Sequence, residues 1–492
     1  MEHLFDKLAA YREAGIYPCH MPGHKREALG RLPSALAGID ITEIEGFDNL
    51  HQPEGLLREL QQRAAVLCGA EESFYLVNGS TGGVLSAVSA ALPRGGRILM
   101  ARNCHKSAYH AAYLRGLKIS CLYPELLEEY DIYEAVTGDQ IRLALEREPD
   151  IGAVLIVSPT YEGRIADVAG IARFVHDRGI PLIVDEAHGA HLGLNRRVHE
   201  NSCQAGADLV IQSVHKTLPA LTQTALLHVN GKLIDRELLR RFLRIYQSSS
   251  PSYLLMASID SALDYVENCG EEAYAAFERQ YRGMLNNLRK CRHLRFLPED
   301  PERQDLGKLM ISVKNTAITG MQLYDILLKS YRIQTEMASG SYVLAMFTLG
   351  DGPDGYARME RALLEIDGEL GKDSGEDRES GKEKQLSEAL AEMSHGGRKE
   401  TDSAIPLEIA WDEEKELTLL SECAGRYAGE FISLYPPGIP LTVPGERLTE
   451  EMVRDVSRWL EEGLNIQGLE RRGGEYFVWT LRKESGRRHP EA

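Results

Sequence analysis

Residues 182–188 have the sequence LIVDEAH and residues 209–217 have the sequence LVIQSVHKT, and these two stretches decide the fold. Each begins with a short apolar run of the kind that forms a buried strand. Asp185 ends the first run, and Lys216 follows closely after the second. Because open α/β sheets bind ligands beyond the carboxyl ends of their strands, the pattern predicts a site built from an acid and an amine.

The region around these stretches repeats the pattern of strand and helix. Between residues 71 and 229, short apolar runs alternate with helical patterns, as in βαβ units around a largely parallel sheet. Several runs are apolar throughout, as expected for strands that are covered on both faces. The expected strands are residues 74–77, 97–100, 153–157, 182–184, 209–212 and 225–229.

The composition is that of a globular protein with two or three domains. The chain has 492 residues, of which 43% are hydrophobic, and a formal net charge of −18. This charge argues against unspecific binding to nucleic acid or to an anionic membrane, because both demand clustered Lys and Arg. No apolar run approaches the roughly 20 residues that span a bilayer, and the start lacks a signal-peptide pattern, so we expect a cytoplasmic protein. The eight cysteines form no CxxC pair, which favours neither a disulfide framework nor a metal site.

Changes in composition divide the chain into five expected parts. Residues 371–403 are rich in Gly, Ser, Glu and Lys and have too few apolar side chains to offset the entropy of ordering, so we expect a flexible linker with at most a helical turn or two at 385–393. An amphipathic helix is expected at 273–289, and a rigid loop at 435–440, YPPGIP. The five parts are an N-terminal arm (1–70), a large domain (71–258), a small domain (259–370), the linker (371–403) and a C-terminal domain (404–492).

A glycine-bearing turn, NGSTGG at residues 78–83, follows an expected strand and opens a helical pattern. Its backbone N–H groups and the hydroxyls of Ser80 and Thr81 can face an anion, and the helix dipole adds attraction. Taken alone, the turn is equally consistent with an ordinary strand-to-helix connection that caps the helix. It matches neither the Walker loop nor the GxGxxG pattern.

Asp185 is costly to bury unless a cation pairs with it, and a protonated pyridine nitrogen is such a cation. In isolation a helix cap or a metal ligand is an alternative role. The string DEAH at 185–188 also resembles a helicase motif, but no phosphate-binding lysine precedes it.

Lys216 would by default be a surface lysine. Burial and neighbouring cations would lower its pKa and make its amine a nucleophile that forms a Schiff base with an aldehyde cofactor. Ser213 and His215 are near it in sequence and can hold phosphate oxygens. His105, which follows another expected strand, can cover one face of an aromatic ring, although a single histidine is more often an ordinary polar contact. Along the chain the order is the phosphate turn, then His105, then Asp185 and then Lys216, and together these four segments specify one ligand, pyridoxal 5'-phosphate, held as an imine on Lys216.

In DEAH at 185–188 and SVHK at 213–216, the sequence resembles the fold-type I pyridoxal-phosphate enzymes, and specifically the bacterial Orn/Lys/Arg decarboxylase family. The resemblance covers the chain from about Met21 to about Gly445. Further segments that are similar to signatures of that family are MPGHK (21–25), RNCHKS (102–107), QSSSPSY (247–253), YPPGIP (435–440) and PGE (444–446).

The resemblance implies an α/β fold, with an aspartate aminotransferase-like large domain around a mostly parallel sheet and with smaller α+β domains. It implies that Lys216 bonds to the cofactor, that Asp185 pairs with the pyridine nitrogen and that His105 stacks on the ring. In the family the site lies at a dimer interface, so Ser249 and its neighbours are expected to reach the partner's cofactor in a homodimer or a dimer of dimers. The chain resembles the shorter form without an N-terminal wing domain, for which large rings are not expected. The remaining implied cofactor contacts are Ser80, Thr81, Ser213 and His215 at the phosphate, and Ala187 and His188 at the ring.

The implied reaction is decarboxylation of a basic L-amino acid, after which Lys216 or His215 returns a proton to the α-carbon. Arginine is the expected substrate, and lysine and ornithine stay open as alternatives. The corresponding products would be agmatine, cadaverine and putrescine, which are amines of polyamine biosynthesis. Two alternatives stay open: an aminotransferase or other fold-type I reaction, and a non-catalytic paralogue that binds the cofactor and regulates a decarboxylase. Candidates for the far end of the substrate pocket are Glu336, Glu162 and Asp48, each of which would by default be a surface charge.

Overall fold

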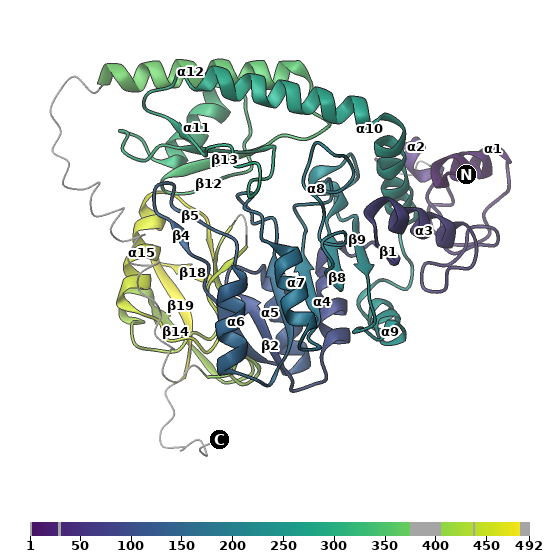
Figure 1. The fold of residues 1–492 in the computed structure, drawn as a ribbon, viewed down its shortest axis with the longest axis horizontal. Helices are drawn as coiled ribbons and strands as arrows, with labels where there is room; N and C mark the ends of the chain where they lie inside the picture. Colours follow the sequence, from purple (N-terminus) through teal and green to yellow (C-terminus); the bar gives the residue numbers. More distant parts are fainter. Residues whose placement is uncertain (1, 28–30, 374–404, 436–437, 483–492) are drawn as a thin grey trace.

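The computed structural model describes residues 2–27, 31–373, 405–435 and 438–482 (Figure 1). Its centre is a seven-stranded sheet in the order β1-β9-β8-β7-β6-β2-β3. The sheet is mostly parallel, because β9 alone among these seven strands runs opposite to the others. The predicted fold class is therefore confirmed. The strands are β1 (Glu72–Leu76), β2 (Arg97–Ala101), β3 (Lys118–Leu122), β6 (Ile151–Val157), β7 (Leu182–Asp185), β8 (Leu209–Gln212) and β9 (Ala225–Val229).

The predicted strands correspond to six of these seven. β8 and β9 have the predicted bounds, β1 differs by two residues at its start and one at its end, and the others differ by one or two residues at one end. The sequence did not predict β3, which lies at the edge of the sheet and alternates buried and more exposed residues. Its segment lacks the continuous apolar run that marks a strand covered on both faces.

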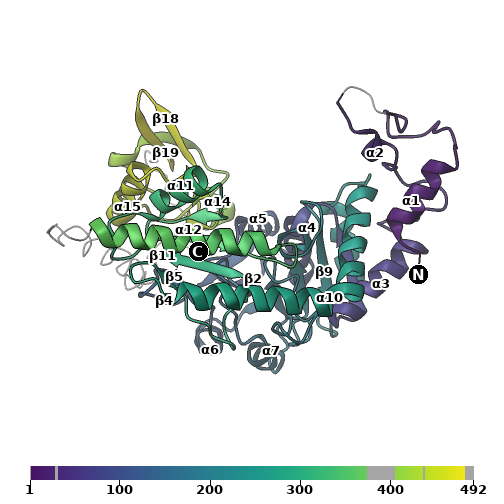
Figure 2. The ribbon, with the colours of Figure 1, turned by 90° about the horizontal axis from the view of Figure 1, so that it is seen from above.

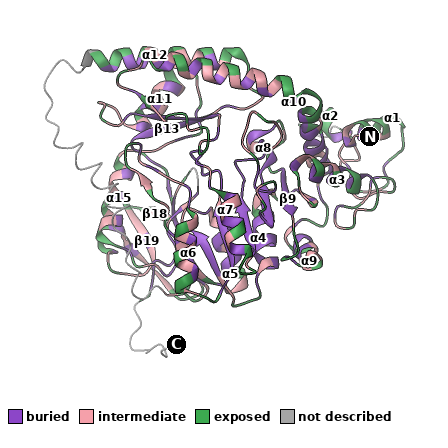
Figure 3. Ribbon diagram, in the orientation of Figure 1, coloured by how far each residue is buried: buried purple, intermediate pink, exposed green. Residues whose placement is uncertain are grey.

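Helices cover both faces of the central sheet. Figure 2 shows α6 and α7 on one side of it, and α4 and α5 on the other. α4 approaches the strands so closely that a Cβ at Gly83 would lie 2.7 Å from Leu76 Cδ1 and 2.9 Å from Ile211 Cγ2, so this position requires glycine. Figure 3 shows the central strands buried between these layers. The helices are α4 (Gly79–Ala91), α5 (Lys106–Arg115), α6 (Gly138–Arg147), α7 (Val168–His176), and α9 (Arg236–Tyr246), which packs on α4.

A second, antiparallel sheet forms the core of a smaller unit, in the order β10-β11-β13-β12. The 36-residue helix α10 (Tyr253–Leu288) joins it to the large sheet, and the expected amphipathic segment 273–289 is the C-terminal half of this helix. The expected domain boundary after residue 258 lies inside α10. The elements of this unit are β10 (Arg295–Phe296), β11 (Lys308–Ser312), α11 (Gly320–Tyr331), β12 (Met337–Ala338), β13 (Tyr342–Met346) and α12 (Pro353–Asp373).

The N-terminal arm contains α1 (Leu4–Glu13), α2 (Ser34–Ala37) and α3 (Leu56–Cys68). α1 and α3 pack against the first half of α10 in one apolar cluster. Figure 2 shows α1 and α2 projecting beyond the main body. Tyr17 and Met21 of the arm expose 78% and 65% of their surface, which is unusual for large apolar side chains.

The C-terminal part of the chain packs beside α5 through an aromatic cluster of Trp411, Phe431, His110 and Tyr113. Its two small sheets have the orders β14-β19-β18 and β16-β15-β17. Its elements are α14 (Leu407–Ala410), β14 (Lys415–Leu419), the 3-10 helix η1 (Leu420–Glu422), β15 (Ile432–Leu434), β16 (Pro440–Thr442), α15 (Glu450–Glu461), β17 (Ile466–Gln467), β18 (Leu469–Arg472) and β19 (Glu475–Leu481).

Two expected features fall largely outside the described residues. α12 continues to Asp373, and the rest of the expected linker, with its helical turn at 385–393, is not described. The same holds for Pro436 and Pro437 in the expected rigid loop. None of the helices in the described part of the chain has the length and apolar character needed to cross a lipid bilayer.

Candidate active site

The predicted acid, Asp185, and the predicted amine, Lys216, both lie at the edge of the sheet formed by the carboxyl ends of the parallel strands. β7 ends at Asp185, and the parallel strand β8 beside it leads through Ser213 into α8 (Val214–Thr217), a single turn that carries Lys216. The chain after β7 turns back so that His188 Nε2 lies 3.0 Å from Lys216 Nζ. The structure therefore brings three predicted residues, Asp185, His188 and Lys216, into one electrostatic environment.

The Lys216 amine is largely buried. Burial lowers its pKa from the usual 10.5, and the negative charges of Asp185 and Glu336 act in the opposite direction. A lysine with a lowered pKa is more often a neutral amine near neutral pH, which is the form that attacks an aldehyde.

Asp185 is 6% exposed, and its carboxylate accepts one hydrogen bond, from the backbone N–H of Ala187 at 3.2 Å. Burial raises its pKa, while the charge of Lys216 lowers it. Among the described residues, no Lys, Arg or His lies within ion-pair distance of this carboxylate. A buried carboxylate without an ion pair is costly, so the site fits a ligand that brings its own cation.

His105 precedes α5 and caps it: its Nδ1 accepts from the backbone N–H of Ser107 at 3.2 Å, and Ser107 Oγ lies 2.9 Å away. Burial lowers the pKa of His105 to about 4, with help from the charge of Lys216, so the ring is neutral. A Cβ on Gly438 would lie 3.5 Å from His105 Nε2, which places the C-terminal loop over this ring. A flat, neutral ring held by a helix cap is suited to stacking on an aromatic ligand.

The predicted phosphate contacts come from two helix starts. Ser80 and Thr81 open α4, where Ser80 is half-buried and Thr81 is exposed. Ser213 begins α8, and its Oγ is buried with no hydrogen-bond partner in the described structure. His215 lies in α8 and its Nδ1 is 2.8 Å from the carbonyl oxygen of Thr224, so Nδ1 donates and Nε2 is left for another contact.

The unpartnered Ser213 hydroxyl tests whether the residues fit pyridoxal 5'-phosphate. A buried hydroxyl without a partner costs about 1–3 kcal/mol, and a ligand with several acceptor oxygens removes that cost. Together with the unpaired Asp185 carboxylate and the buried Lys216 amine, it provides complementary groups for a phosphate, a pyridine nitrogen and an aldehyde. The residues present therefore fit the cofactor.

Three residues near Lys216 were not among the predicted cofactor contacts. Tyr161 lies four residues beyond β6, its ring is 4.9 Å from that of His188 with the planes at 77°, and its hydroxyl donates to Glu336 Oε1 at 2.5 Å. Lys308 opens β11 of the small sheet and is 4% exposed, and its Nζ lies 2.8 Å from His188 Nδ1. Tyr161 follows a strand parallel to β7, which is a signal that the sequence carries, whereas Lys308 and Glu336 come from the small unit.

The three carboxylates considered for substrate binding have different settings. Asp48 accepts four backbone N–H bonds around the start of α3; burial opposes its ionisation, but these bonds outweigh it and lower its pKa. Glu162 is buried and accepts from Tyr342 Oη at 3.1 Å and Thr160 Oγ1 at 3.3 Å. Glu336 is exposed, and its charge acts on both Lys216 and Lys308. Asp48 therefore has a structural role, and Glu336 is the carboxylate that faces the site.

The remaining predicted residues are Ala187 and Ser249. Ala187 is buried next to Asp185 and His188. Ser249 is exposed in the segment after α9, and no hydrogen bond or ion pair among the described residues joins it to the other predicted residues. The neighbouring residue Ser248 contacts the N-terminal arm: its carbonyl oxygen lies 2.7 Å from His51 Nε2.

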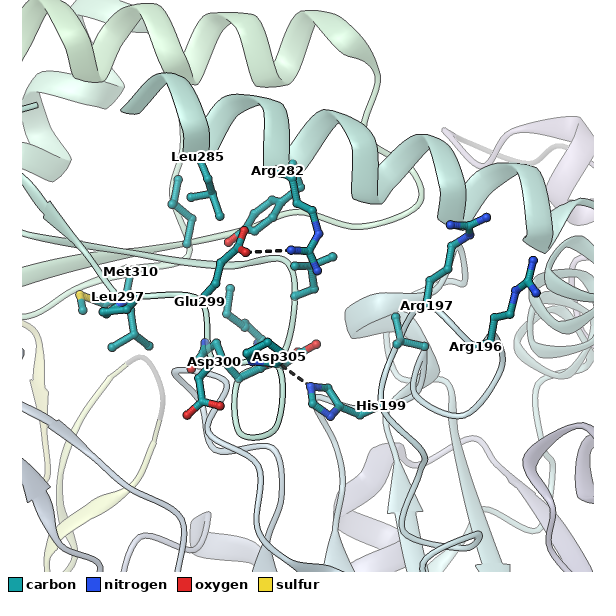
Figure 4. Close-up of a pocket in the computed structure, with 18 residues that line it drawn as sticks. Arg196, Arg197, His199, Arg282, Leu285, Leu297, Glu299, Asp300, Asp305 and Met310 are labelled. Carbon is teal, nitrogen blue, oxygen red and sulfur yellow. Dashed lines mark hydrogen bonds and ion pairs between the residues drawn. The ribbon is translucent and has the colours of Figure 1, made fainter. Parts of the chain in front are cut away.

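A separate pocket of about 240 Å³ lies between α10, β11 and the loop that carries His199 (Figure 4). Its arginines are paired: Arg282 with Glu299 at 2.8 Å, and Arg197 with Glu278 at 3.1 Å. Lys308 lines this pocket as well as contacting His188, so one lysine connects the two spaces.

Comparison with known proteins agrees with this geometry. The model of the Orn/Lys/Arg decarboxylase major domain matches residues 3–300, and that of the C-terminal domain matches residues 402–478. The chain is 33% identical to an arginine decarboxylase of Bacillus subtilis (92% of each chain covered) and 30% identical to one of Bacillus anthracis (95% of this chain, 94% of the relative). The solved structure of lysine decarboxylase A from Pseudomonas aeruginosa superposes with a TM-score of 0.82 at 20% identity, covering 98% of this chain and 80% of that one. The chain therefore belongs to the Orn/Lys/Arg decarboxylase family, whose members use pyridoxal 5'-phosphate to decarboxylate basic amino acids.

Proposed function

We propose that this enzyme decarboxylates L-arginine to agmatine and carbon dioxide in preference to lysine or ornithine, with its cofactor held on Lys216. The observation that carries the proposal is the buried Lys216 amine beside an unpaired buried carboxylate, Asp185. The preference for arginine is supported by the two arginine decarboxylases at 30% and 33% identity, against 20% for the lysine decarboxylase structure.

Each predicted residue has a proposed role toward the cofactor. Lys216 holds its aldehyde carbon, Asp185 keeps its pyridine nitrogen protonated, and His105 covers one face of the ring. When bound, the cofactor supplies the electron sink for the bond to the α-carboxylate. The phosphate is held by Ser80, Thr81, Ser213 and His215, and the rest of the ring is lined by Ala187 and His188.

The protein must also return a proton to the substrate α-carbon. Lys216 is suited to this, because burial lowers the pKa of its amine and so makes its proton easier to give up. His215 is the alternative donor. Its Nδ1–H is engaged with the carbonyl oxygen of Thr224, so its Nε2 can donate a proton only when the ring is protonated, which burial disfavours by lowering its pKa.

We assign recognition of the cationic end of the substrate to Glu336. Its carboxylate is held by the hydroxyl of Tyr161 and acts on Lys216, and a guanidinium binds a carboxylate through two parallel hydrogen bonds. We expect Glu336→Gln to raise KM for arginine by about 10- to 100-fold, the loss expected when a charged hydrogen bond becomes neutral. Steady-state kinetics measures this.

Glu365→Gln is the matched control, because Glu365 also accepts from a tyrosine hydroxyl, that of Tyr331 at 3.1 Å, but lies on α12. An unchanged KM in Glu336→Gln, or an equal rise in both variants, would remove the assignment.

Assay of the purified holoenzyme with arginine, lysine and ornithine tests the reaction and its specificity. We expect carbon dioxide and agmatine without any added 2-oxo acid, and the highest kcat/KM for arginine. A higher kcat/KM for lysine would overturn the specificity. A requirement for a 2-oxo acid would indicate an aminotransferase, and no turnover of any of the three would indicate a regulatory paralogue.

We also propose that two copies assemble so that Ser249 of one reaches the cofactor of the other, in a homodimer or a dimer of dimers. The exposed segment around Ser249 and the exposed apolar side chains of the N-terminal arm support this. A cytoplasmic location and a place in polyamine biosynthesis remain predictions from the sequence. Sedimentation of the purified chain tests the assembly, and a monomer would contradict it.

A further inference from the structure

Two lysines, of which Lys308 is buried and Lys216 partly buried, contact the two ring nitrogens of one histidine. His188 Nε2 lies 3.0 Å from Lys216 Nζ, and His188 Nδ1 lies 2.8 Å from Lys308 Nζ. The two lysines come from different units, α8 of the large one and β11 of the small one. His188 is 8% exposed and Lys308 is 4% exposed, so little water competes for these contacts.

Counting protons shows that the two lysines are not both charged. A lysine ammonium only donates hydrogen bonds, and a neutral imidazole has one N–H group and one lone pair. Burial, together with the nearby lysine charges, holds the pKa of His188 well below its usual value, so its ring is neutral. The lysine that faces the ring N–H group must therefore be a neutral amine that accepts from the ring, and the other lysine, which donates to the ring lone pair, is the one that can be an ammonium. When that lysine is charged, the three side chains share one excess proton.

The surroundings of Lys308 leave it close to balance between these two states. Burial lowers the pKa of Lys308 to about 8, and the charge of Lys216 acts in the same direction. No carboxylate among the described residues forms an ion pair with it. The charged and polar groups that face it are Asp305, Glu162 and Glu336, which favour its charged form, Lys216 and His188, and the ring of Tyr161 at 5.8 Å.

We propose that Lys308 stores the proton that Lys216 exchanges during turnover and passes it through His188. In the forward step the Lys308 ammonium gives a proton to His188 Nδ1 while His188 Nε2–H gives one to Lys216 Nζ. The imidazole changes tautomer, Lys308 becomes a neutral amine and Lys216 becomes an ammonium; the reverse step restores the first state. Lys308 acts through His188 and is a positioning residue.

The relay would let Lys216 change its protonation state between two steps of the reaction. It rests on the proposed role of Lys216 in holding the cofactor. Lys216 must be neutral to bond to an aldehyde carbon, and it must carry a proton to donate one to the substrate carbon. Lys308 satisfies both by taking or giving the proton. Lys308 also lines the pocket of Figure 4.

The test is the pKa of Lys216 in the full-length chain after the cofactor has been dialysed away. Acetylation of Lys216 by acetic anhydride is followed by peptide mass spectrometry as a function of pH. In Lys308→Met the competing charge is gone, so the pKa of Lys216 should rise by about one unit. In Lys308→Arg a permanently charged donor fixes the His188 proton on Nε2 and holds Lys216 neutral, so its pKa should fall by a similar amount, about one unit.

Opposite shifts in the two variants show that the protons of Lys308 and Lys216 are coupled, because a merely structural lysine would give no shift or the same shift in both. Lys308→Gln keeps a hydrogen bond to His188 without a charge and should behave as Lys308→Met, which preserves the test if Lys308→Arg does not fold. Lys314→Met is the matched control, since Lys314 follows β11 and pairs with Asp131 at 2.8 Å, and it should leave the pKa of Lys216 unchanged.

In the holoenzyme, the pH profile of kcat should shift in the same direction as the pKa of Lys216 in each variant. The profile of Lys308→Arg should therefore not return to that of the unaltered enzyme, although arginine keeps the positive charge. An unchanged pKa of Lys216 in all three Lys308 variants would overturn the relay. This outcome differs from failure of the proposed function, in which Lys216 would not carry the cofactor whatever its pKa.

Discussion

At the scale of single residues, the site depends on burying charges that are only partly balanced by the protein itself. Asp185 has one backbone hydrogen bond and no ion pair among the described residues, although it is 6% exposed. Burying a carboxylate without a paired cation costs several kcal/mol of lost solvation. That cost is reasonable where the bound ligand supplies the opposite charge.

We expect Asp185→Asn to retain the cofactor but to lower kcat on the order of 100-fold, because a neutral amide cannot keep a pyridine nitrogen protonated. Absorbance of the bound cofactor and steady-state kinetics measure the two effects. The control is Asp208→Asn, at the amino ends of the same strands, where Asp208 accepts from His176 at 2.7 Å and from Leu182 N–H at 2.8 Å. A kcat for Asp185→Asn within twofold of that of the control would contradict this role.

At the scale of elements, β9 contains a histidine that constrains the pH range of the sheet. His228 is fully buried and lies 2.6 Å from Ser73 Oγ and 3.1 Å from Gln212 Oε1. Burial lowers its pKa from 6.5 to about 3. As the pH falls from 6.5 towards 3, the unfolded chain takes up a proton that the folded sheet excludes, so stability is lost by about 1.4 kcal/mol per pH unit.

We therefore expect His228→Gln, which cannot titrate, to lose about 2 kcal/mol less stability than the unaltered chain between pH 7 and pH 5. The thermal unfolding midpoint, measured at the two pH values for each protein, gives this difference. The change in midpoint between the two pH values is what is compared, because the substitution also alters hydrogen bonds and so shifts the midpoint at both pH values. An identical pH dependence in the two proteins would show that His228 is not the titrating group.

The individual strands also indicate how much of the fold and of the site could be predicted from the sequence. Mostly apolar runs marked β8 and β9 at their true ends, since a strand covered on both faces has no regular polar alternation. Asp185, His188 and Lys216 were predictable as neighbours because parallel strands place their carboxyl ends at one edge. The contact of Lys308 with His188, 120 residues apart, was not, because it depends on how the small sheet docks on the large one.

At the scale of the whole molecule, Arg102 links the large unit to the C-terminal part. Its guanidinium donates to the carbonyl oxygens of Pro440 at 2.7 Å and Leu441 at 3.1 Å and pairs with Glu446 at 3.0 Å. The pair is mostly buried, so removing one partner leaves a costly charge behind. The link holds the C-terminal loop over His105.

We expect Arg102→Met to destabilise this interface by about 3–5 kcal/mol. Hydrogen exchange measured by mass spectrometry should show faster exchange in β15 and β16 and unchanged exchange in β7 and β8. Arg482→Met is the control, because Arg482 forms an exposed pair with Glu414 at 2.8 Å within the C-terminal part and should change little. Equal exchange in both variants would mean that Arg102 does not hold the interface.

The central claim is that Lys216, and not the more deeply buried Lys308, carries the cofactor. Borohydride reduction of the holoenzyme followed by peptide mapping tests it most directly, because reduction makes the bond between lysine and cofactor permanent. The account predicts a phosphopyridoxyl group on Lys216 alone. A label on Lys308, or no labelled lysine in an active preparation, would contradict it.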